Sequence, residues 1–319
     1  MATNGGHPFA LRRIMEPFNI HILGCGSAKP STRHNSACQV VEMRGKLYMI
    51  DCGEGAQIEF TAQRLNSNHL SHIFISHNHG DHVFGLPGFI STLGLLGRTA
   101  DLHIHGPKML EALLNTTLSI YCQGMEYDVH FHAVDTTKHQ IIFEDRSMEV
   151  WSLPLKHRVP CCGFLFREKP GLPHIRRDMI DAFHIPVSQI NNIKAGASWT
   201  TEDGTFIPHE NLTTPATPPR SYAYCSDTAY MPELATLVHD TTLLYHEATY
   251  PDELQDRANE YCHSTSRQAA QIALDAHAKR LCLGHYSLRI KDEAAHLREA
   301  QEVFPNTLLT HEGQIIRVE

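Results

Sequence analysis

Long apolar runs are absent from this sequence of 319 residues. No stretch approaches the roughly 20 consecutive apolar residues that cross a membrane, so we expect no membrane association. The first residues, Met1 to Phe18, contain Arg12 and Arg13 but no continuous apolar stretch after them. They therefore lack the pattern of a secretory signal peptide.

A disulfide framework is also absent. The nine cysteines are an odd number without a repeated spacing, and Cys161 and Cys162 are adjacent. Secreted disulfide-rich proteins show even numbers of cysteines at regular spacings. We therefore expect reduced thiols and a cytoplasmic protein.

Positive charge is scarce. Lys and Arg number 27 against 35 Asp and Glu, which gives a formal net charge of −8 with neutral histidines. Taken alone, this balance argues against nucleic-acid binding, which depends on cationic side chains that neutralise phosphates. Bound divalent cations would reverse the local charge where a substrate meets the protein, so the composition is compatible with a phosphate substrate.

Histidine, in contrast, is abundant, with 24 residues. A compositional bias would explain this number without any function. The alternative explanation is that several histidines bind metal, because neutral imidazole is the commonest metal ligand in proteins.

Short apolar runs alternate with helical patterns along the chain. The runs indicate buried strands at residues 20–23, 47–50, 72–75, 102–104, 150–155, 222–225, 243–245 and 281–283. Helices are predicted from residue 86 by an i, i+3, i+4, i+7 spacing, from Thr265 by a capping box, and at Asp292–Phe304. This alternation predicts a layered α/β domain.

Residues 167–220 differ from this pattern. They contain seven prolines and three glycines and few strand-like runs, which indicates an insertion that projects from the main body. Six Lys and Arg residues are balanced by six acidic residues, so the segment is not a basic patch.

The run His77-Asn-His79-Gly-Asp81-His82 directly follows the predicted strand 72–75 and precedes a helix. A tight turn between a strand and a helix can direct alternate side chains at one point. His77 and His79 could then share one ion, with Asp81 and His82 on a neighbouring ion. Imidazole and carboxylate ligands suit zinc.

Three further ligand candidates, His157, Asp227 and His285, each lie just past a predicted strand. Taken singly, each could be a loop residue that caps or hydrogen-bonds. The strand ends of a layered α/β domain converge on one edge, which is where α/β ligand sites form. Together with the histidine-rich run, these positions predict a metal-dependent hydrolase that holds two metal ions.

These motifs resemble the metallo-β-lactamase superfamily and, within it, the ribonuclease Z family of endonucleases that mature the 3′ end of tRNA. Ser76 to His82 is similar to the metal motif of that family, and Leu47-Tyr-Met-Ile-Asp51-Cys-Gly-Glu-Gly to its preceding strand and acidic turn. Three further segments resemble motifs of this branch, namely His246-Glu-Ala-Thr249, His263-Ser-Thr265 and Gly284-His-Tyr-Ser287. The resemblance extends from about Phe18 to the C-terminus.

The resemblance implies a four-layer αβ/βα sandwich, with two mixed sheets flanked by helices, formed by residues 1–319 as a single domain. Residues 167–220 would be an inserted, exosite-like arm that grips tRNA. The protein would hold two zinc ions per subunit, or manganese or iron in their place, and would form a homodimer.

The resemblance also implies the distribution of the ligands. Three side chains would bind one ion, namely His77, His79 and His157. Three others would bind the second ion, namely Asp81, His82 and His285. Asp227 would bridge the two ions, and Asp51 would shape the turn beneath the site instead of binding metal.

The implied activity is hydrolysis of a phosphodiester in precursor tRNA, which removes the 3′ trailer and leaves a 3′-hydroxyl on the tRNA. Two adjacent metal ions lower the pKa of a water molecule, so that hydroxide is present near neutral pH. Asp81 would orient or deprotonate this water. His263 would protonate the leaving ribose oxygen, and Glu247 would raise the pKa of His263.

Both acid–base residues have structural alternatives, since Glu247 could be a buried structural carboxylate and His263 a neighbour of the helix that begins at Thr265. Substrate contacts are expected at that helix N-terminus and in two loops. The candidates are Ser264, Thr265, Arg289 and Arg33.

Two segments depart from the family pattern. The family arm often contains a Gly-Pro pair, which residues 185–196 lack. A family loop that reads Pro-x-Lys-x-Arg-Asn corresponds to Pro30–Asn35, where Thr32 and His34 replace the lysine and the arginine.

Two other functions fit part of the pattern. A small-molecule phosphodiesterase, lactonase or thioester hydrolase of the same superfamily would keep the metals and change the substrate. A zinc-stabilised nucleic-acid-binding module would not be an enzyme. Structural zinc sites are usually closed and rich in cysteine, unlike this set of His and Asp side chains.

Overall fold

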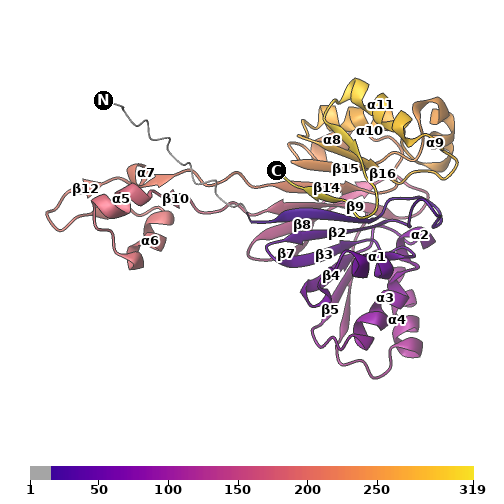
Figure 1. Ribbon diagram of the computed structural model, residues 1–319, viewed down its shortest axis with the longest axis horizontal. Helices are drawn as coiled ribbons and strands as arrows, with labels where there is room; N and C mark the ends of the chain where they lie inside the picture. The colour runs from indigo at the N-terminus through magenta and orange to yellow at the C-terminus, as the bar shows by residue number, and fades with distance from the viewer. Residues whose placement is uncertain (1–15) are drawn as a thin grey trace, which may run out of the picture.

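Two seven-stranded sheets face each other in the computed structural model, which describes residues 16–319. Helices cover the outer surface of each sheet, so the molecule has four layers (Figure 1). This arrangement confirms the predicted αβ/βα sandwich. The prediction that Arg12 and Arg13 belong to no secretory signal lies outside the described residues.

The first sheet contains the N-terminal strands and the last strand of the chain. These are β1 (Phe18–Gly24), β2 (Cys38–Met43), β3 (Lys46–Ile50), β4 (Leu70–Phe74), β5 (Leu102–Gly106), β6 (Val129–Ala133) and β18 (Ile315–Arg317). Their order is β18-β1-β2-β3-β4-β5-β6. The pairs from β3 to β6 are parallel, and those from β18 to β3 are antiparallel.

The second sheet contains most of the C-terminal strands. These are β7 (Ile141–Glu144), β8 (Met148–Leu155), β9 (Cys161–Glu168), β14 (Ser221–Cys225), β15 (Leu243–Glu247), β16 (Leu281–Gly284) and β17 (Thr307–Leu309). Their order is β17-β16-β15-β14-β9-β8-β7. The pairs from β14 to β17 are parallel, and those from β7 to β14 are antiparallel.

The helices of the body divide between the two sheets. Beside the first sheet are α1 (Ala56–Ala62), α2 (Gly80–Val83), α3 (Leu86–Leu95) and α4 (Leu110–Tyr121), with a short 3-10 helix at Ser67–His69. Beside the second sheet are α8 (Leu234–Leu237), α9 (Gln255–Tyr261), α10 (Ser266–Asp275) and α11 (Glu293–Val303), with a 3-10 helix at Asp252–Leu254. No helix within residues 16–319 is long and apolar enough to cross a membrane.

Strand alternation explains how the layers hold together, because successive side chains of a strand point to opposite faces of the sheet. In β3, Tyr48 and Ile50 belong to the large core cluster that both sheets share. Leu47 and Met49 belong to a second cluster, with side chains of α1, α3 and α4. The first sheet is therefore packed on both faces, which holds its strand ends in place.

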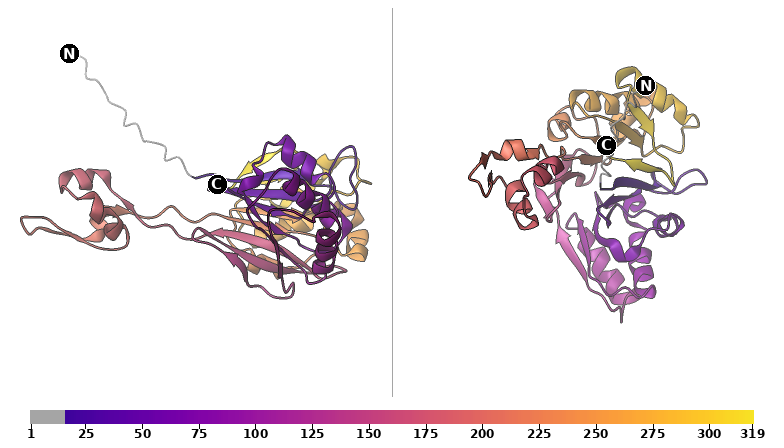
Figure 2. Two further views of the ribbon diagram at one scale, coloured as in Figure 1. Left: turned by 90° about the horizontal axis from the view of Figure 1, so that it is seen from below. Right: turned by 60° about the vertical axis from the view of Figure 1, so that its left-hand side comes forward.

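The inserted segment leaves the body between β9 and β14 and projects far beyond it (Figure 1, Figure 2). Its elements are β10 (His174–Ile175), α5 (Arg177–Ala182), α6 (Val187–Lys194), β11 (Trp199–Thr200), β12 (Phe206–Ile207), α7 (His209–Leu212) and β13 (Thr213–Thr214). It has a small core of its own, formed by Ile185, Ile193, Ile207 and Leu212. We call residues 169–220 the arm.

The arm differs from the sequence prediction in two respects. Arg167 and Glu168 lie in β9, so the projecting segment begins two residues later than the predicted boundary. The sequence analysis also predicted no helix in this segment, but it contains α5, α6 and α7, and Pro186 and Pro208 are the N-cap residues of α6 and α7. A helix start tolerates proline because the N–H groups there lack partners inside the helix.

Every strand predicted from an apolar run is present, as are the helices α3, α10 and α11. Thr265 is the N-cap of α10, and the predicted capping box with Gln268 is formed. The sequence analysis missed the less apolar strands, such as β6, in which His130 and His132 are exposed. It also missed β9, whose side chains are almost all buried.

Candidate active site

The predicted metal ligands lie at one edge of the sandwich, where strands of both sheets end. His77 and His79 follow β4, and α2 begins directly afterwards and contains Asp81 and His82. The remaining candidates follow β8, β14 and β16 of the second sheet, in the order His157, Asp227 and His285. The fold thus brings together segments that are far apart in the sequence.

Four side chains form a first group of donor atoms that all lie within 4.8 Å of one another, namely His77, His79, His157 and Asp227. His79 Nδ1 lies 3.1 Å from His77 Nε2 and 3.2 Å from His157 Nε2. Asp227 Oδ2 lies 3.7 Å from each of these two Nε2 atoms. Three nitrogens and one oxygen therefore face a common point.

Three side chains form a second group on the same criterion, namely Asp81, His82 and His285. Asp81 Oδ2 lies 3.7 Å from His82 Nε2 and 3.6 Å from His285 Nε2. The other oxygen of Asp227, Oδ1, lies 3.5 Å and 3.1 Å from the same two nitrogens. The two oxygens of Asp227 thus face different groups, as a bridging carboxylate would.

Hydrogen bonds on the far side of each ring determine which nitrogen faces the site. His82 Nδ1 lies 2.7 Å from Asp51 Oδ2, and His157 Nδ1 lies 3.0 Å from the carbonyl oxygen of Cys262. Both partners only accept, so each Nδ1 carries the proton. Because Nδ1 of each ring makes this outer contact, Nε2 is the nitrogen that faces the site, as in metal sites whose ligands are oriented by outer partners.

The same argument applies to His285. The hydroxyl of Thr249 donates to Glu247 Oε2 at 2.7 Å, so its oxygen accepts from His285 Nδ1 at 2.9 Å. His285 Nε2 is left as a lone-pair donor aimed into the site. Thr249 belongs to the segment His246–Thr249 that the sequence analysis singled out.

Three buried atoms of the site have no hydrogen-bond partner among the described residues, namely His82 Nε2, His285 Nε2 and Asp227 Oδ1. A buried polar atom without a partner costs about 1–3 kcal/mol, so such atoms rarely cluster without a reason. Burial also lowers the pKa of His77 and His157, which keeps both rings neutral. Neutral imidazoles and carboxylates are ligands of divalent metals such as zinc, so the donor set fits a divalent metal cofactor.

Asp51 lies beneath the ligands and makes no contact that would suit a metal ion. Its carboxylate accepts from the backbone N–H of Ser76 at 2.7 Å and from the hydroxyl of Tyr224 at 2.9 Å. Together with the contact to His82, these bonds occupy both oxygens, in agreement with the expected structural role. Gly53, two residues after Asp51, lets this turn approach α2, because a Cβ there would lie 2.3 Å from the carbonyl oxygen of Asp81.

Glu247 and His263 form a pair beside the metal ligands. His263 Nδ1 lies 2.8 Å from Glu247 Oε1, and Glu247 is fully buried. Burial lowers the pKa of His263, but the adjacent Glu247 carboxylate more than offsets this and raises the pKa to about 9. His263 is therefore protonated near neutral pH. Glu247 also accepts from the backbone N–H groups of Thr228 and Thr249, which fixes its position.

A cavity of about 440 Å³ opens onto both groups of ligands and onto His263. Arg289 lines it, as expected from the sequence. The sequence analysis missed Arg158 and Arg257, which also line it, together with Tyr261. The Arg158 guanidinium lies over the Tyr261 ring, 5.5 Å from its centroid. The one available signal was the position of Arg158 directly after the ligand His157.

Three other predicted substrate contacts do not line the cavity. The hydroxyl of Ser264 donates to the carbonyl oxygen of Thr228, and the Thr265 hydroxyl caps α10 and donates to Asp252. Both residues are fully buried. Arg33 donates to the carbonyl oxygens of residues 288 and 290 at 3.0 and 2.9 Å. In this structure, the polar groups of these three side chains make hydrogen bonds within the protein.

The chain is similar to known proteins over nearly its whole length. It is 51% identical to "Ribonuclease Z" of Parabacteroides distasonis over 304 residues, which cover 95% of this chain and 100% of the relative. It is 53% identical to "Ribonuclease Z" of Bacteroides thetaiotaomicron over 304 residues, covering 95% and 96% of the two chains. A family model described as "Anti-Pycsar protein Apyc1" matches residues 18–172.

Solved structures agree with the fold. Human tRNase Z, short form, superimposes with a TM-score of 0.67 at 24% identity and covers 94% of this chain and 99% of its own. The metallo-beta-lactamase fold protein YhfI from Bacillus subtilis gives a TM-score of 0.67 at 16% identity, with coverage of 95% and 100%. The layered arrangement of the two sheets thus belongs to a recurrent fold.

Proposed function

This chain belongs to the ribonuclease Z family, and on that premise we propose that it is an endoribonuclease that removes the 3′ trailer from precursor tRNA. The identity to the two relatives described above supports the family. The observation that carries the activity is the Glu247–His263 pair beside two groups of metal ligands. A phosphodiesterase needs a proton donor at the leaving group, and a non-catalytic zinc module has no use for one.

The proposed cofactor is a pair of zinc ions. One ion would be held by His77, His79 and His157, and the other by Asp81, His82 and His285. Asp227 would bind both ions. Manganese and iron accept the same kinds of ligand, so either could take the place of zinc. When bound, such ions supply charge neutralisation at the phosphoryl oxygens and a water of lowered pKa. What supports the proposal is the set of buried donors without partners.

The protein side chains perform the remaining steps. Hydrolysis adds a water oxygen to phosphorus and breaks the bond to the ribose O3′, which leaves as the new 3′-hydroxyl of the tRNA. His263 donates the proton that O3′ takes up, and Glu247 stabilises the charged form of His263 beforehand. Asp81 orients or deprotonates the attacking water. Arg158, Arg257 and Arg289 bind the phosphates on either side of the cleaved bond.

The arm is proposed to bind the substrate away from the site, in a homodimer. The Cys161 end of β9 lies near the metal ligands, because the Cys161 thiol contacts the carbonyl oxygen of Asp227 at 3.5 Å. The Glu168 end leads into the arm, roughly 23 Å of strand away. The arm also points away from its own site (Figure 1). This geometry supports an arrangement in which the arm of one subunit serves the site of the other. We further propose a cytoplasmic location, which the nine free cysteines support.

The test is incubation of the purified protein with a 3′-extended precursor tRNA, followed by mapping of the product ends. A single cut at the trailer junction, with a 3′-hydroxyl on the tRNA and a 5′-phosphate on the trailer, is expected. Turnover of a chromogenic phosphodiester without cleavage of the precursor would instead identify a small-molecule phosphodiesterase. Failure to cleave either substrate with added metal would refute the catalytic proposal.

A further inference from the structure

A backbone N–H group from a distant loop contacts one of the proposed ligands. Ala28 N donates to Asp81 Oδ2 at 2.6 Å. This oxygen also faces His82 and His285, so it is the one that the second ion would meet. Ala28 has a φ of 66°, in the left-handed region that costs a residue with a side chain roughly 1–2 kcal/mol. The surrounding structure must therefore hold Ala28 in place.

Backbone hydrogen bonds connect the loop around Ala28 to residues 34 and 35, which follow it in the chain, and to Tyr286. Gly26 N donates to the carbonyl oxygen of Asn35 at 2.9 Å, and Ser31 N donates to that of His34 at 2.8 Å. Ser27 N donates to the carbonyl oxygen of Tyr286, which follows the ligand His285. A displacement of residues 34 and 35 would therefore move Ala28 relative to Asp81.

The side chain of His34 holds residues 34 and 35 in place. It is buried, and each of its ring nitrogens faces a carboxylate: Nδ1 lies 3.0 Å from Glu312 Oε2, and Nε2 lies 2.9 Å from Glu293 Oε1. A carboxylate can only accept, so both nitrogens carry protons and the ring is a cation. His34 thus links the loop to α11 and to the segment between β17 and β18.

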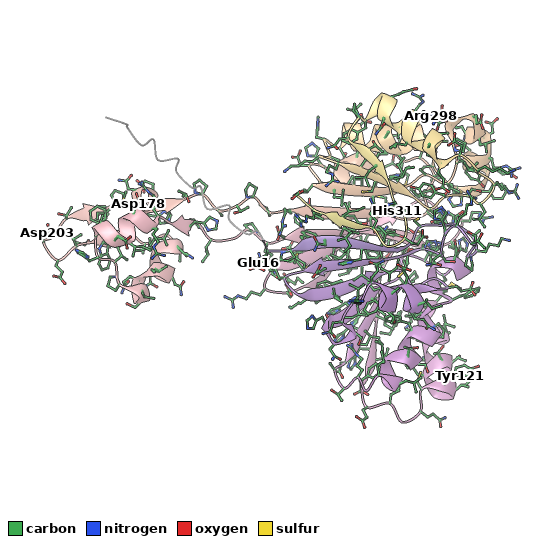
Figure 3. The ribbon with its side chains drawn as sticks, in the orientation of Figure 1. Glu16, Tyr121, Asp178, Asp203, Arg298 and His311 are labelled. Atoms are coloured by element: carbon green, nitrogen blue, oxygen red, sulfur yellow. The ribbon has the colours of Figure 1, made fainter. Side chains whose placement is uncertain are left out.

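The two carboxylates also bind the neighbours of His34. Glu312 Oε1 accepts from Asn35 N at 2.9 Å, and Glu293 Oε1 accepts from the Arg33 guanidinium at 3.2 Å. Glu312 follows His311, which Figure 3 labels on the body, far from the arm residue Asp203. The contacts of His34, Glu293 and Glu312 form a cluster that we call the loop clamp.

A third metal site is the competing explanation, because Cys25, His34 and Glu312 offer donor atoms within 4.8 Å of one another. A metal would require a lone pair on His34 and a thiolate at Cys25. Both His34 nitrogens are occupied by acceptors, and the side-chain hydrogen bond to Glu312 raises the pKa of His34. Burial and the Glu312 carboxylate raise the pKa of the Cys25 thiol, which stays protonated. Hydrogen bonding between charged groups therefore accounts for the cluster.

We propose that His34 is a positioning residue for catalysis, which, through the loop clamp, holds the Ala28 N–H on Asp81 and so fixes the carboxylate that the second ion and the attacking water require. The inference rests on the proposed nuclease function. The proposed role also explains why His34 can stand at the loop position where the family pattern has arginine. Either side chain provides a cation that can donate to two carboxylates.

The experiment compares His34→Gln, His34→Arg and the control His239→Gln, which removes an exposed histidine that also faces a carboxylate, that of Asp240. Three quantities are measured: kcat and KM on precursor tRNA, the release of bound zinc to a chelator, and amide hydrogen exchange. For His34→Gln we expect kcat to fall between about ten- and a hundredfold with little change in KM. Zinc release and exchange in residues 26–36 should accelerate. His34→Arg should restore all three values toward those of the parent, and His239→Gln should match the parent.

Parent-like turnover and loop exchange in His34→Gln would overturn the proposal, as would a His34→Arg variant as impaired as His34→Gln. Faster exchange throughout the chain would point to general destabilisation and would also overturn it. If His34→Gln does not fold, Glu293→Gln removes only one of the two carboxylates that His34 contacts. It should lower kcat and accelerate zinc release and loop exchange in the same direction, but by less. If the parent fails to cleave precursor tRNA, the nuclease proposal fails, while zinc release and loop exchange still test the clamp.

Discussion

The metal-binding edge and the arm are constructed in opposite ways. The edge assembles buried and half-buried side chains that follow β4, β8, β14 and β16 of the two sheets. The arm is one continuous segment with its own small core. A substitution at the edge therefore acts on contacts from several parts of the chain, whereas the arm can change its sequence without moving the site. This difference explains how the arm can lack the Gly-Pro pair of its family while every proposed ligand is present.

The two regions also differ in charge. The edge gathers Arg158, Arg257 and Arg289 around one cavity. Cations of the arm are largely paired with acids, as in Arg176–Asp178 and at its base in Arg220–Glu168. The arm instead exposes apolar side chains, with Val187 83% exposed and Phe206 64%. We infer that the edge recognises phosphates and that the arm contributes contacts that depend less on charge.

The largest effect is expected at the edge, from Asp227→Ala. Each oxygen of Asp227 faces a different group of ligands, so the variant should lose bound metal and, with it, nearly all turnover of both precursor tRNA and a chromogenic phosphodiester. Elemental analysis and kinetics provide the measurement. Full metal occupancy in this variant would refute the bridging role.

His263→Ala should leave the metals in place and lower kcat by about 10² to 10⁴, because only the proton donor is removed. The control is metal content, which should equal that of the parent. If the variant loses metal, His263 is a ligand instead. A chromogenic substrate whose leaving group needs no protonation should be affected much less than precursor tRNA.

Replacement of residues 169–220 by a short Gly-Ser linker should affect only the natural substrate. Because β9 and β14 are antiparallel neighbours that pair Arg167 with Ser221, a short turn can join them. We expect kcat/KM on precursor tRNA to fall about tenfold or more, equivalent to about 1.4 kcal/mol, with chromogenic turnover unchanged.

Mixed dimers test whether the arm acts on the partner subunit. A subunit without the arm, combined with an Asp227→Ala subunit that keeps it, should regain activity toward precursor tRNA.

Two arm cations, Arg177 and Lys194, have no ion-pair partner among residues 16–319. Loss of the arm should therefore reduce the salt dependence of binding by a log–log slope of no more than about two. A much larger change in this slope would show that the arm binds tRNA mainly through contacts between its cations and the phosphates.

Glu247→Gln should change the pH dependence of turnover more than its maximum. Glu247 keeps the pKa of His263 at about 9, and the proposed mechanism requires the protonated ring, so we expect activity to fall as the pH rises through that pKa. Without the carboxylate charge, this pKa falls and the alkaline limb of the kcat/KM profile should move to lower pH by about one unit or more. An unmoved limb would mean that another group sets it. Glu233→Gln, at an exposed glutamate, is the control.

The comparison also shows what could be predicted from the sequence. Apolar runs identify buried strands, and the ligands lie directly after them, so strand ends such as those before His157 and Asp227 could be located without coordinates. Arg257 could not be found in this way, because only the packing of α9 against the site brings it to the cavity. Two helices of the arm, α6 and α7, escaped prediction because Pro186 and Pro208 stand at their starts. Local propensity does not distinguish that role from the interruption of a helix.

The most direct test of the central claim is a metal titration of precursor cleavage. Metal is removed from the purified protein with a chelator, zinc is returned in steps, and 3′ cleavage with mapped ends is followed at each step. The account predicts no cleavage without metal, and a rise that is complete at about two equivalents per chain. Cleavage by the metal-free protein, or full activity at one equivalent, would contradict it.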